Sequence, residues 1–301
     1  MAPSHGPAAL TRAPGARAAA SVGAVAMLLA LAACVTLTRE PRGLVQDDDG
    51  TLRVAAIACD AKAAPPVPAG GAGLDPASIR LLTWNIHKQA DAGWDRDLAR
   101  LAAASDVVLL QEATLGAGLR PVLDAGGLRW VMASSFIYED FDFGVLTAAR
   151  LRPLASCALR ANEPLLGIPK SGLVAWFALA GRQDTMAVVN VHAVNFALTL
   201  PGYEAQIGAL AATLQEHAGP IVFAGDFNTW SDARMAAVRA AVAPLRLVEV
   251  PLRDDRRATF LGSPVDHVLV RGLAVVDAVA EPVKSSDHNP VRVTLRVDVP
   301  R

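Results

Sequence analysis

The chain has 301 residues, 52% of them hydrophobic and 5% aromatic, and its 28 basic and 29 acidic residues give a formal net charge of −1. This length and this apolar content exclude disorder throughout and allow one large domain or two smaller ones. The balanced charge disfavours a protein that holds nucleic acid nonspecifically, so a small or lipidic substrate fits better.

The amino-terminal residues have the composition of an export signal. Arg12 and Arg17 precede residues 18–38, which carry no charge, and a basic start followed by an apolar stretch is typical of a secretory signal. Within this stretch, "LAAC" resembles the bacterial lipoprotein cleavage box, in which Cys34 would be acylated. We therefore expect residues 1–38 to direct export and to tether the protein to a membrane outside the cytoplasm.

Two alternatives remain for this segment. An uncleaved helix of this length, at about 1.5 Å rise per residue, would just span the core of a bilayer and would also act as a tether. Translation could also begin near Met27, which would leave almost no signal. The predicted location depends on this choice, whereas the predicted chemistry does not.

The two other cysteines have two interpretations. If Cys34 carries lipid, Cys59 and Cys157 remain, in a compartment where disulfides persist. They could form a disulfide that joins the amino-terminal segment to the rest of the chain. Alternatively, each could be a small buried hydrophobic residue.

A change of composition divides the chain before residue 79. Residues 61–78, "AKAAPPVPAGGAGLDPAS", are rich in proline, glycine and alanine, which is the composition of a linker. We predict that residues 39–78 form an extracytoplasmic segment that ends in this linker, and that residues 79–301 form the main folded domain.

From residue 79 onward, short apolar runs alternate with helical patterns, which predicts a layered α/β domain. In the last run, apolar residues alternate with polar ones from Val291 to Val299, so one face of that strand should be buried. The predicted strands are residues 79–86, 106–113, 185–194, 220–228, 265–270 and 289–299, and the predicted helices are residues 95–104, 203–217 and 232–242, the last capped by Ser231.

Polar side chains stand at the ends of these strands. Each one has an ordinary explanation by itself: Asp226 and Asn228 could form a turn, and His192 could be a satisfied core histidine. Their joint placement is more informative, because strand ends that converge at one rim of a sheet can gather an active site. The residues concerned are Asn85, Glu112, His192, Asn195, Asp226, Asn228, Asp266, Asp287 and His288.

The segments around these residues resemble a known superfamily. "TWNIH", "LLQEA", "FGVLTAAR", "NVHAVNF", "GDFNT", "VDHVLV" and "SDHNPV" occur in the order and rough spacing of the endonuclease/exonuclease/phosphatase superfamily, the metal-dependent phosphoesterases related to deoxyribonuclease I. The resemblance covers nearly everything from Ile79 to the end. It implies an α/β four-layer sandwich, with two mostly antiparallel or mixed β-sheets packed face to face between flanking helices, and residues 79–301 as the catalytic domain.

The resemblance also implies a metal site. Asn85 and Glu112 match the family's metal ligands, and Asp287 matches a residue that contributes to the same cluster directly or through water. Oxygen ligands of this kind suit Mg²⁺ or Mn²⁺ rather than zinc.

The remaining residues match catalytic positions of the family. His288 resembles the catalytic histidine, and Asp266 resembles the carboxylate that orients its ring. Asp226 resembles the residue that positions or deprotonates the attacking water, and either it or His288 could be the base. Asn228, in the same "GDFN" motif as Asp226, matches an amide that contacts a phosphate oxygen, and His192 matches a histidine near the scissile phosphate, a candidate general acid or phosphate contact. Asn195, three residues on, is a less certain substrate contact.

These matches predict a phosphoesterase, and they leave its substrate open. We expect a Mg²⁺- or Mn²⁺-dependent hydrolase of a phosphodiester or phosphomonoester, exported and membrane-tethered, whose substrate is a lipid headgroup, a small molecule or a nucleic acid. One alternative is a nuclease acting on DNA or RNA. Another is a catalytically inactive envelope binding module of the same fold. No protein partner can be inferred from the sequence.

Overall fold

The computed structural model describes residues 35–38, 41–47, 49–59, 65–67, 70–116, 118–164, 167–195 and 199–298. The chain divides into two units, residues 1–36 and residues 37–301. Of the first unit only β1 (Val35–Thr36) is described, so Cys34 and nearly all of the expected export signal lie outside the described residues. No helix within the described ranges is long and apolar enough to cross a membrane.

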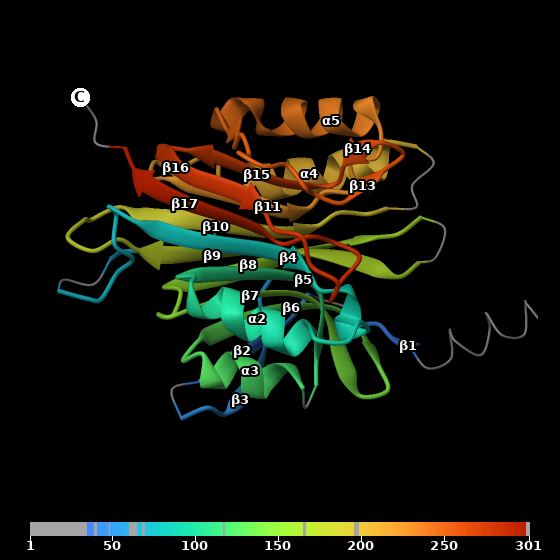
Figure 1. The fold of residues 1–301 in the computed structure, drawn as a ribbon, viewed down its shortest axis with the longest axis horizontal. Helices are drawn as coiled ribbons and strands as arrows, with labels where there is room; N and C mark the ends of the chain where they lie inside the picture. The colour runs from blue at the N-terminus through green and yellow to red at the C-terminus, as the bar shows by residue number, and fades with distance from the viewer. Residues whose placement is uncertain are drawn as a thin grey trace, which may run out of the picture. The chain divides into compact units, whose positions relative to one another are not determined.

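Two β-sheets form the centre of the second unit (Figure 1). The strands run in the order β16-β17-β4-β5-β7-β6-β2-β3 in the larger sheet and β12-β15-β11-β10-β9-β8 in the smaller sheet. The larger sheet contains β2 (Arg42–Gln46), β3 (Leu52–Ala56), β4 (Ile79–Asn85), β5 (Val107–Leu115), β6 (Arg129–Tyr138), β7 (Phe141–Ala149), β16 (Leu273–Ala280) and β17 (Val291–Val297). The smaller sheet contains β8 (Ala155–Asn162), β9 (Pro169–Ala178), β10 (Thr185–His192), β11 (Ile221–Asp226), β12 (Val248–Glu249) and β15 (Asp266–Arg271), and a separate hairpin is formed by β13 (Thr259–Phe260) and β14 (Ser263–Pro264).

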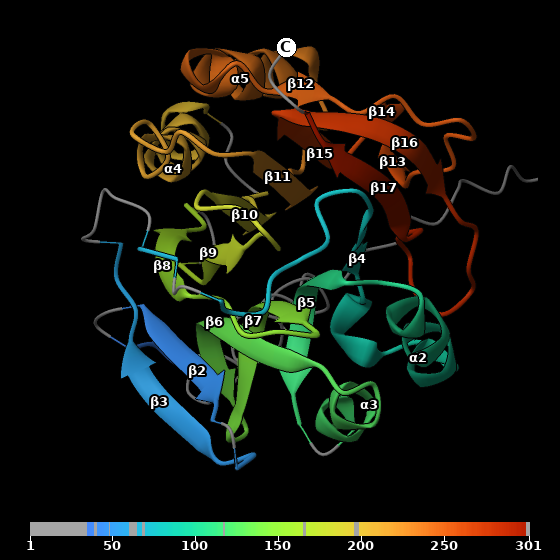
Figure 2. The same ribbon diagram turned by 90° about the vertical axis from the view of Figure 1, so that its left-hand side faces the viewer.

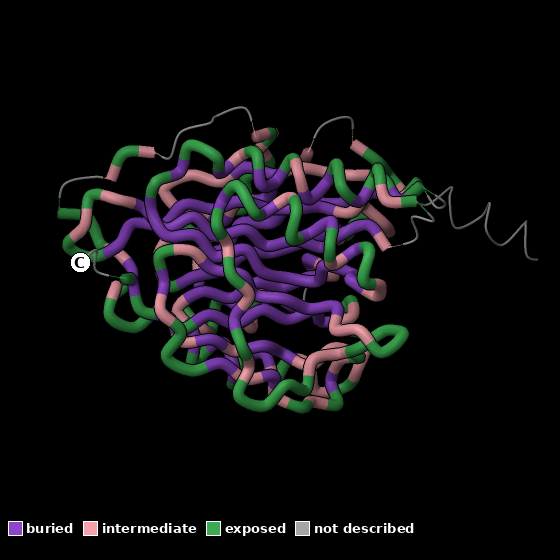
Figure 3. Tube along the Cα trace, turned by 90° about the horizontal axis from the view of Figure 1, so that it is seen from above, coloured by how far each residue is buried: buried purple, intermediate pink, exposed green. Residues whose placement is uncertain are grey.

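Helices cover the outer face of each sheet (Figure 2), and the two inner faces pack against each other through apolar residues such as Leu109, Phe177 and Val222. Buried segments accordingly run along the strands, while exposed segments lie in loops and on outer helix faces (Figure 3). The helices are α2 (Trp94–Ala103) and α3 (Leu119–Ala125) on the larger sheet, α4 (Pro201–Ala212) and α5 (Asp232–Val242) on the smaller sheet, and the short 3₁₀ turns η1 (His87–Gln89) and η2 (Ala243–Leu245). The expected α/β sandwich of four layers is therefore confirmed.

Two parallel strand pairs bring polar strand ends to one place. β4 pairs with β5, and β10 with β11, in parallel, and α2 and α4 lie in the crossover connections that such pairs need. Asn85 lies opposite Gln111 in the first pair, and His192 lies opposite Asp226 in the second. Asp226 also lies opposite Asp266 in the antiparallel pair of β11 and β15. The carboxyl ends of these parallel strands therefore open at the same end of the two sheets.

The predicted elements are present, with some shifted ends. α5 begins at Asp232 as expected, and the Ser231 side chain accepts a hydrogen bond from the backbone N–H of Arg234. α4 ends earlier than predicted, because residues after Ala212 form turns, although Leu214 is still buried.

The residues before position 79 join the second unit more closely than their composition suggests. β2 pairs with β6, and β3 with β2, so both strands extend the larger sheet. Leu74, within the proline- and glycine-rich segment, is buried and exchanges backbone hydrogen bonds with Ala178 and Ala180 on the smaller sheet. The expected boundary at Ile79 thus falls inside a unit that begins at Leu37.

A disulfide joins Cys59 to Cys157 on β8, across a sequence separation of 98. The structure therefore contains the bonded alternative of the two that the sequence allows. Cross-linking so distant positions lowers the entropy of the unfolded chain, an effect of about 2 to 5 kcal/mol for native disulfides. The bond fastens the strand pair β2–β3 to the smaller sheet.

Candidate active site

A pocket of about 590 Å³ lies where the polar strand ends meet. Residues from both sheets and from the loop before β17 line it. Among the site residues predicted from the sequence, Asp266 alone does not line this pocket, because it lies behind His288. The predicted residues in the lining are Asn85, Glu112, His192, Asn195, Asp226, Asn228, Asp287 and His288.

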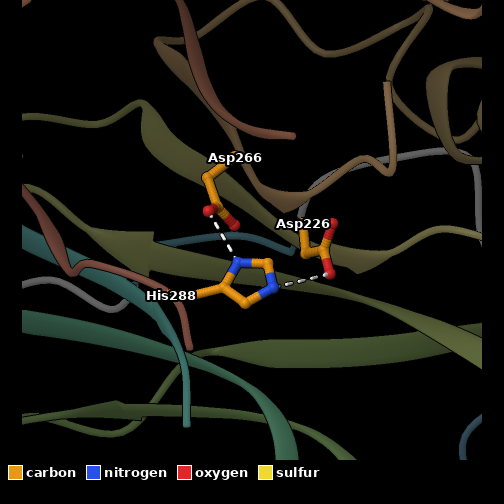
Figure 4. Close-up of side chains that lie close together, drawn as sticks. All are labelled: Asp226, Asp266 and His288. Atoms are coloured by element: carbon orange, nitrogen blue, oxygen red, sulfur yellow. Dashed lines mark hydrogen bonds and ion pairs between the residues drawn. The ribbon is translucent and has the colours of Figure 1, made fainter. Parts of the chain in front are cut away.

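His288 lies between two carboxylates (Figure 4). Its Nδ1 is 2.7 Å from Asp266 Oδ2, and its Nε2 is 4.0 Å from Asp226 Oδ2. Burial alone would lower the pKa of His288, but the charges of Asp266 and Asp226 and the hydrogen bond to Asp266 raise it to about 10. The ring is therefore an imidazolium at neutral pH, and it can donate a hydrogen bond through Nε2 rather than accept a proton there.

Backbone contacts fix the orientation of this histidine. Trp84 Nε1 donates a hydrogen bond to the carbonyl oxygen of His288, and the backbone N–H of His288 donates to Ser286 Oγ. Ser286 Oγ in turn donates to the carbonyl oxygen of Asn85. The polar loop before β17 is thus attached to the end of β4.

Asp226 is buried, and its two carboxylate oxygens are held separately. Oδ1 accepts a hydrogen bond from the backbone N–H of Asn228 at 2.9 Å, and Oδ2 accepts one from Asn85 Nδ2 at 3.0 Å. The preceding Gly225 has φ of 138°, and a Cβ there would lie 2.1 Å from the carbonyl oxygen of Val191. Glycine is therefore required at this position of β11, directly before the carboxylate that lines the pocket.

Asn228 and Asn195 form part of the opposite wall. Asn228 has φ of 50°, and its Nδ2 donates to the carbonyl oxygen of Ala193 at 2.9 Å. Asn195 Oδ1 accepts a hydrogen bond from Trp230 Nε1, and its carbonyl oxygen accepts one from the buried Arg234. The side-chain oxygen of Asn195 is therefore already engaged, which restricts its expected role as a substrate contact to its amide nitrogen.

Glu112 is a second carboxylate in the pocket lining, which also contains Glu163 and Asp287. It sits at an irregularity in the pairing of β5 with β7, with φ of 50°. The Lys88 ammonium contacts it, and Lys170 Nζ and His192 Nε2 lie 3.8 and 3.7 Å from Oε1. Burial favours the neutral acid, but these neighbours outweigh it and lower the pKa of Glu112 to about 2.

His192 differs from His288 because its nearest neighbour is a cation. Lys170 Nζ lies 2.9 Å from His192 Nε2, and burial together with this charge lowers the pKa of His192 to about 4. The ring is neutral at physiological pH and its Nε2 accepts a hydrogen bond from Lys170. This arrangement does not favour the expected role of His192 as a general acid. It also means that the two lysines supply the positive charge beside Glu112.

The sequence analysis missed Lys170 and a polar bridge beneath the pocket. Gln111 Nε2 donates to Asn190 Oδ1 at 2.7 Å, which joins β5 of the larger sheet to β10 of the smaller sheet. Both side chains are fully buried beside predicted site residues, Glu112 and His192. Polar residues inside otherwise apolar strands were the available signal for this bridge, whereas a single lysine at the start of β9 offers none.

Oxygen donors on one side of the pocket fit a divalent cation. Asn85 is buried and Glu112 nearly so, whereas Asp287 is more exposed, and its Oδ1 lies 3.9 Å from His87 Nδ1. A carboxylate pair with an amide oxygen is a donor set that Mg²⁺ or Mn²⁺ accepts. Asp226, Asp266 and His288 form a second compact group. In that group, however, the imidazolium of His288 already supplies the positive charge that a metal ion would bring.

Known proteins share this fold and these segments. The model of the Endonuclease/Exonuclease/phosphatase family matches residues 82–288. A UPF0294 protein of Vibrio vulnificus (strain CMCP6) is 41% identical over 218 residues, 72% of this chain and 76% of the relative. A UPF0294 protein of Klebsiella pneumoniae (strain 342) is 38% identical over 229 residues, 76% of this chain and 86% of the relative.

Solved structures are similar in fold at much lower identity. An endonuclease/exonuclease/phosphatase from Beutenbergia cavernae DSM 12333 has a TM-score of 0.60 and 18% identity, covering 74% of this chain and 72% of its own. The human Nocturnin catalytic domain with bound sulfate anion has a TM-score of 0.59 and 17% identity, covering 75% of this chain and 96% of its own. ANGEL2, a 2′,3′-cyclic phosphatase in complex with adenosine-2′,3′-vanadate, has a TM-score of 0.60 and 14% identity, covering 76% of this chain and 98% of its own.

Proposed function

We propose that this chain, which belongs to the endonuclease/exonuclease/phosphatase family, hydrolyses a phosphodiester with a divalent metal ion and an activated water. Members of this family are phosphoester hydrolases. The observation that carries the proposal is the pocket in which Asp226 Oδ2 lies 4.0 Å from His288 Nε2 and 3.5 Å from His192 Nε2. Asp266 holds the other ring nitrogen of His288, and Lys170 and Glu112 belong to the same lining.

In the proposed reaction, the oxygen of one water forms a bond to phosphorus while the bond from phosphorus to the leaving oxygen breaks. Asp226 takes the proton of that water, because its carboxylate is buried and its lone pairs are directed by Asn228 and Asn85. The leaving oxygen takes up a proton from solvent. This assignment makes Asp226 the base, since His288 is already protonated.

The other residues stabilise charge. His288 donates through Nε2 to a non-bridging phosphoryl oxygen, and Asp266 holds its ring in place. Lys170 and Lys88 attract the anionic substrate into the pocket. A bound Mg²⁺ or Mn²⁺, held by Glu112, Asn85 and Asp287, would neutralise further phosphate charge.

We also propose that the protein is exported and membrane-tethered through residues 1–38. The support is the uncharged stretch of residues 18–38 after Arg12 and Arg17, with Cys34 as the candidate acylated residue. Mass measurement of Cys34 peptides from membrane fractions would distinguish acylation from an uncleaved helix.

The direct test is hydrolysis of bis(p-nitrophenyl) phosphate by the full chain with Mg²⁺, with Mn²⁺ and with chelator. Asp226→Asn should lose roughly 10³-fold in rate, as expected for removal of a positioned base. Asp277→Asn, which changes an exposed carboxylate paired with Arg253 on β16, is the matched control and should retain full rate. Equal rates for both variants would show that the base is misassigned. A folded protein inactive on this substrate and on plasmid would favour the binding module.

A further inference from the structure

The short turn after β4 has an unusual backbone. η1 (His87–Gln89) lies beside the pocket, and its three residues have φ of 45°, 56° and 57°. Residues other than glycine enter this left-handed region rarely, and then singly rather than in a row. Among the described residues, no other run of three non-glycine residues has positive φ. The conformation of η1 therefore costs free energy, and contacts to the rest of the fold must hold it.

Both ends of η1 are bonded to the strand that carries Glu112. Just before η1, the backbone N–H of Ile86 donates a hydrogen bond to the carbonyl oxygen of Gln111 at 3.1 Å. At the other end, Gln89 Nε2 donates to the carbonyl oxygen of Thr114 at 2.8 Å, and Gln89 Oε1 accepts from the backbone N–H of Thr114 at 3.0 Å. Gln111 and Thr114 lie on either side of Glu112 on β5. These bonds therefore hold η1 next to the Glu112 carboxylate.

From this position η1 contacts two of the three residues assigned to the metal site. The Lys88 ammonium contacts Glu112 Oε2. The backbone N–H of His87 donates a hydrogen bond to Asn85 Oδ1 at 3.1 Å. The ion pair does not explain the strained backbone by stability alone, because the Lys88 side chain is 50% exposed and such pairs contribute little. Strain that folding does not explain is typical of functional sites.

The two lysines of the pocket differ in their freedom to move. The Lys170 side chain is 19% exposed, and its Nζ is held 2.9 Å from His192 Nε2 and 3.8 Å from Glu112 Oε1. Lys88 also lines the pocket, but it is half exposed and its ammonium is carried on a flexible four-carbon stem. A divalent cation brings two positive charges to Glu112 Oε2, where the ammonium brings one. Lys88 is therefore the group that such a cation would displace.

We propose that Lys88 neutralises Glu112 only until a divalent cation binds there, and that its ammonium then moves to a non-bridging oxygen of the substrate phosphate. Gln89 is the positioning residue that holds η1 in place for both contacts. This inference rests on the proposed function and deepens it, because an ammonium paired with Glu112 does not serve the phosphate. Metal binding therefore prepares the pocket for the substrate.

Metal binding tests the exchange independently of turnover. In calorimetric titrations of the full chain, Lys88→Met should bind Mn²⁺ about tenfold more tightly than the parent protein, because no ammonium competes for Glu112. Gln89→Ala should also tighten Mn²⁺ binding, since the loss of its two hydrogen bonds to Thr114 releases η1 and with it Lys88. Arg296→Met removes an exposed charge on β17 and should bind Mn²⁺ like the parent. Unchanged or weaker Mn²⁺ binding by Lys88→Met would overturn the inference, and the same result for Gln89→Ala would remove its positioning role.

Steady-state kinetics at saturating Mn²⁺ test the contact with the phosphate. For Lys88→Met, the KM for bis(p-nitrophenyl) phosphate should rise about tenfold while kcat changes less, because the lost attraction acts on bound substrate and transition state alike. Lys88→Arg keeps the charge and should have a KM near that of the parent. Tighter metal binding together with weaker substrate binding distinguishes the exchange from misfolding, which would weaken both.

The parent protein separates failure of this inference from failure of the proposed function. A KM of Lys88→Met equal to that of the parent would overturn the exchange and leave the proposed function standing. A parent protein that binds Mn²⁺ without hydrolysing a phosphodiester would refute the proposed function, and calorimetry alone would then decide whether Lys88 competes for Glu112. A parent protein that binds no Mn²⁺ would refute the metal site and this inference together.

Discussion

The two histidines of the pocket, His288 and His192, differ in charge at neutral pH, because His288 is protonated and His192 is neutral, although burial lowers the pKa of both. On the His288 side, formed by His288, Asp266 and Asp226, two carboxylates raise the histidine pKa to about 10. On the His192 side, formed by His192, Lys170, Lys88 and Glu112, a lysine ammonium reinforces burial and the pKa falls to about 4. Burial is the largest influence on both rings; the carboxylates outweigh it at His288, whereas the Lys170 charge reinforces it at His192.

This difference separates two tasks within one pocket. The His288 side keeps a proton donor next to Asp226, the carboxylate that we propose as the base. The His192 side keeps a neutral ring and a carboxylate surrounded by cations, which suits the binding of phosphate and metal. Each of the following changes removes one of these charges.

Glu112→Gln should have the largest effect, because it removes the more buried of the two anionic ligands of the proposed metal site. We expect about a 10³-fold loss of rate, corresponding to several kcal/mol of charge stabilisation. Calorimetric titration with Mn²⁺ should show weakened binding to the same variant. Full affinity for Mn²⁺ in this variant would place the metal elsewhere, with the Asp226, Asp266 and His288 group as the next candidate.

Asp266→Asn should have the next largest effect, roughly 10²-fold on rate, because His288 loses the carboxylate that orients and charges its ring. The pKa of His288 should fall, and this can be followed by NMR of the imidazole in the presence of chelator. Glu249→Gln is a control on the same sheet, since Glu249 contacts His267 rather than His288. An unchanged His288 titration would mean that Asp266 does not maintain the imidazolium.

Lys170→Met should have a smaller effect, about tenfold, because Lys88 remains beside Glu112. It should raise the pKa of His192, since the neighbouring positive charge is removed. The pKa values of His192 and His288 should therefore lie closer together. Arg296→Met, an exposed cation on β17, should change neither quantity. A His192 titration that is unaffected by Lys170→Met would leave burial as the dominant cause.

The smallest expected effect is on stability, measured by urea unfolding across pH in the presence of chelator. The folded pKa of His288 lies above its ordinary value of 6.5, so its contribution is complete below pH 6.5 and is lost as pH rises through about 10. The folded pKa of His192 lies below 6.5, so its contribution is present above pH 6.5 and is lost as pH falls through about 4. Asp266→Asn should flatten only the alkaline slope. An alkaline slope that persists in Asp266→Asn would contradict the assignment of that slope to His288.

The sequence predicted the elements that have strong apolar patterns. β4, β5, β10 and β11 are continuous apolar runs, and β17 alternates as expected, with Val291 and Val293 buried. Strands β6 to β9 were not predicted, because residues such as Ser134 and Ser171 interrupt their apolar pattern and are buried in hydrogen bonds only after the strands pair. β2 and β3 were not predicted either, because they are short and precede a linker-like segment.

The site was predictable to the extent that its residues follow buried strands. Asp226, Asp266 and His288 belong to motifs whose order is visible in the sequence, and the structure places them within hydrogen-bonding or ion-pair distance. The charge states were not predictable, because they depend on distances between residues far apart in the chain. Lys170 acts on His192 across 22 positions, at a separation that only the pairing of β9 with β10 fixes.

The last strand has a consequence for the order of folding. β17 lies inside the larger sheet, between β16 and β4, rather than at an edge. The loop that carries Asp287 and His288 is held in place by this strand and by contacts to β4. A chain still being synthesised lacks β17, so its sheet stays open beside β4 and its catalytic histidine is not yet in position. Contacts between such distant segments also make folding slow. The pocket is therefore assembled only after the last strand has left the ribosome and paired with β4.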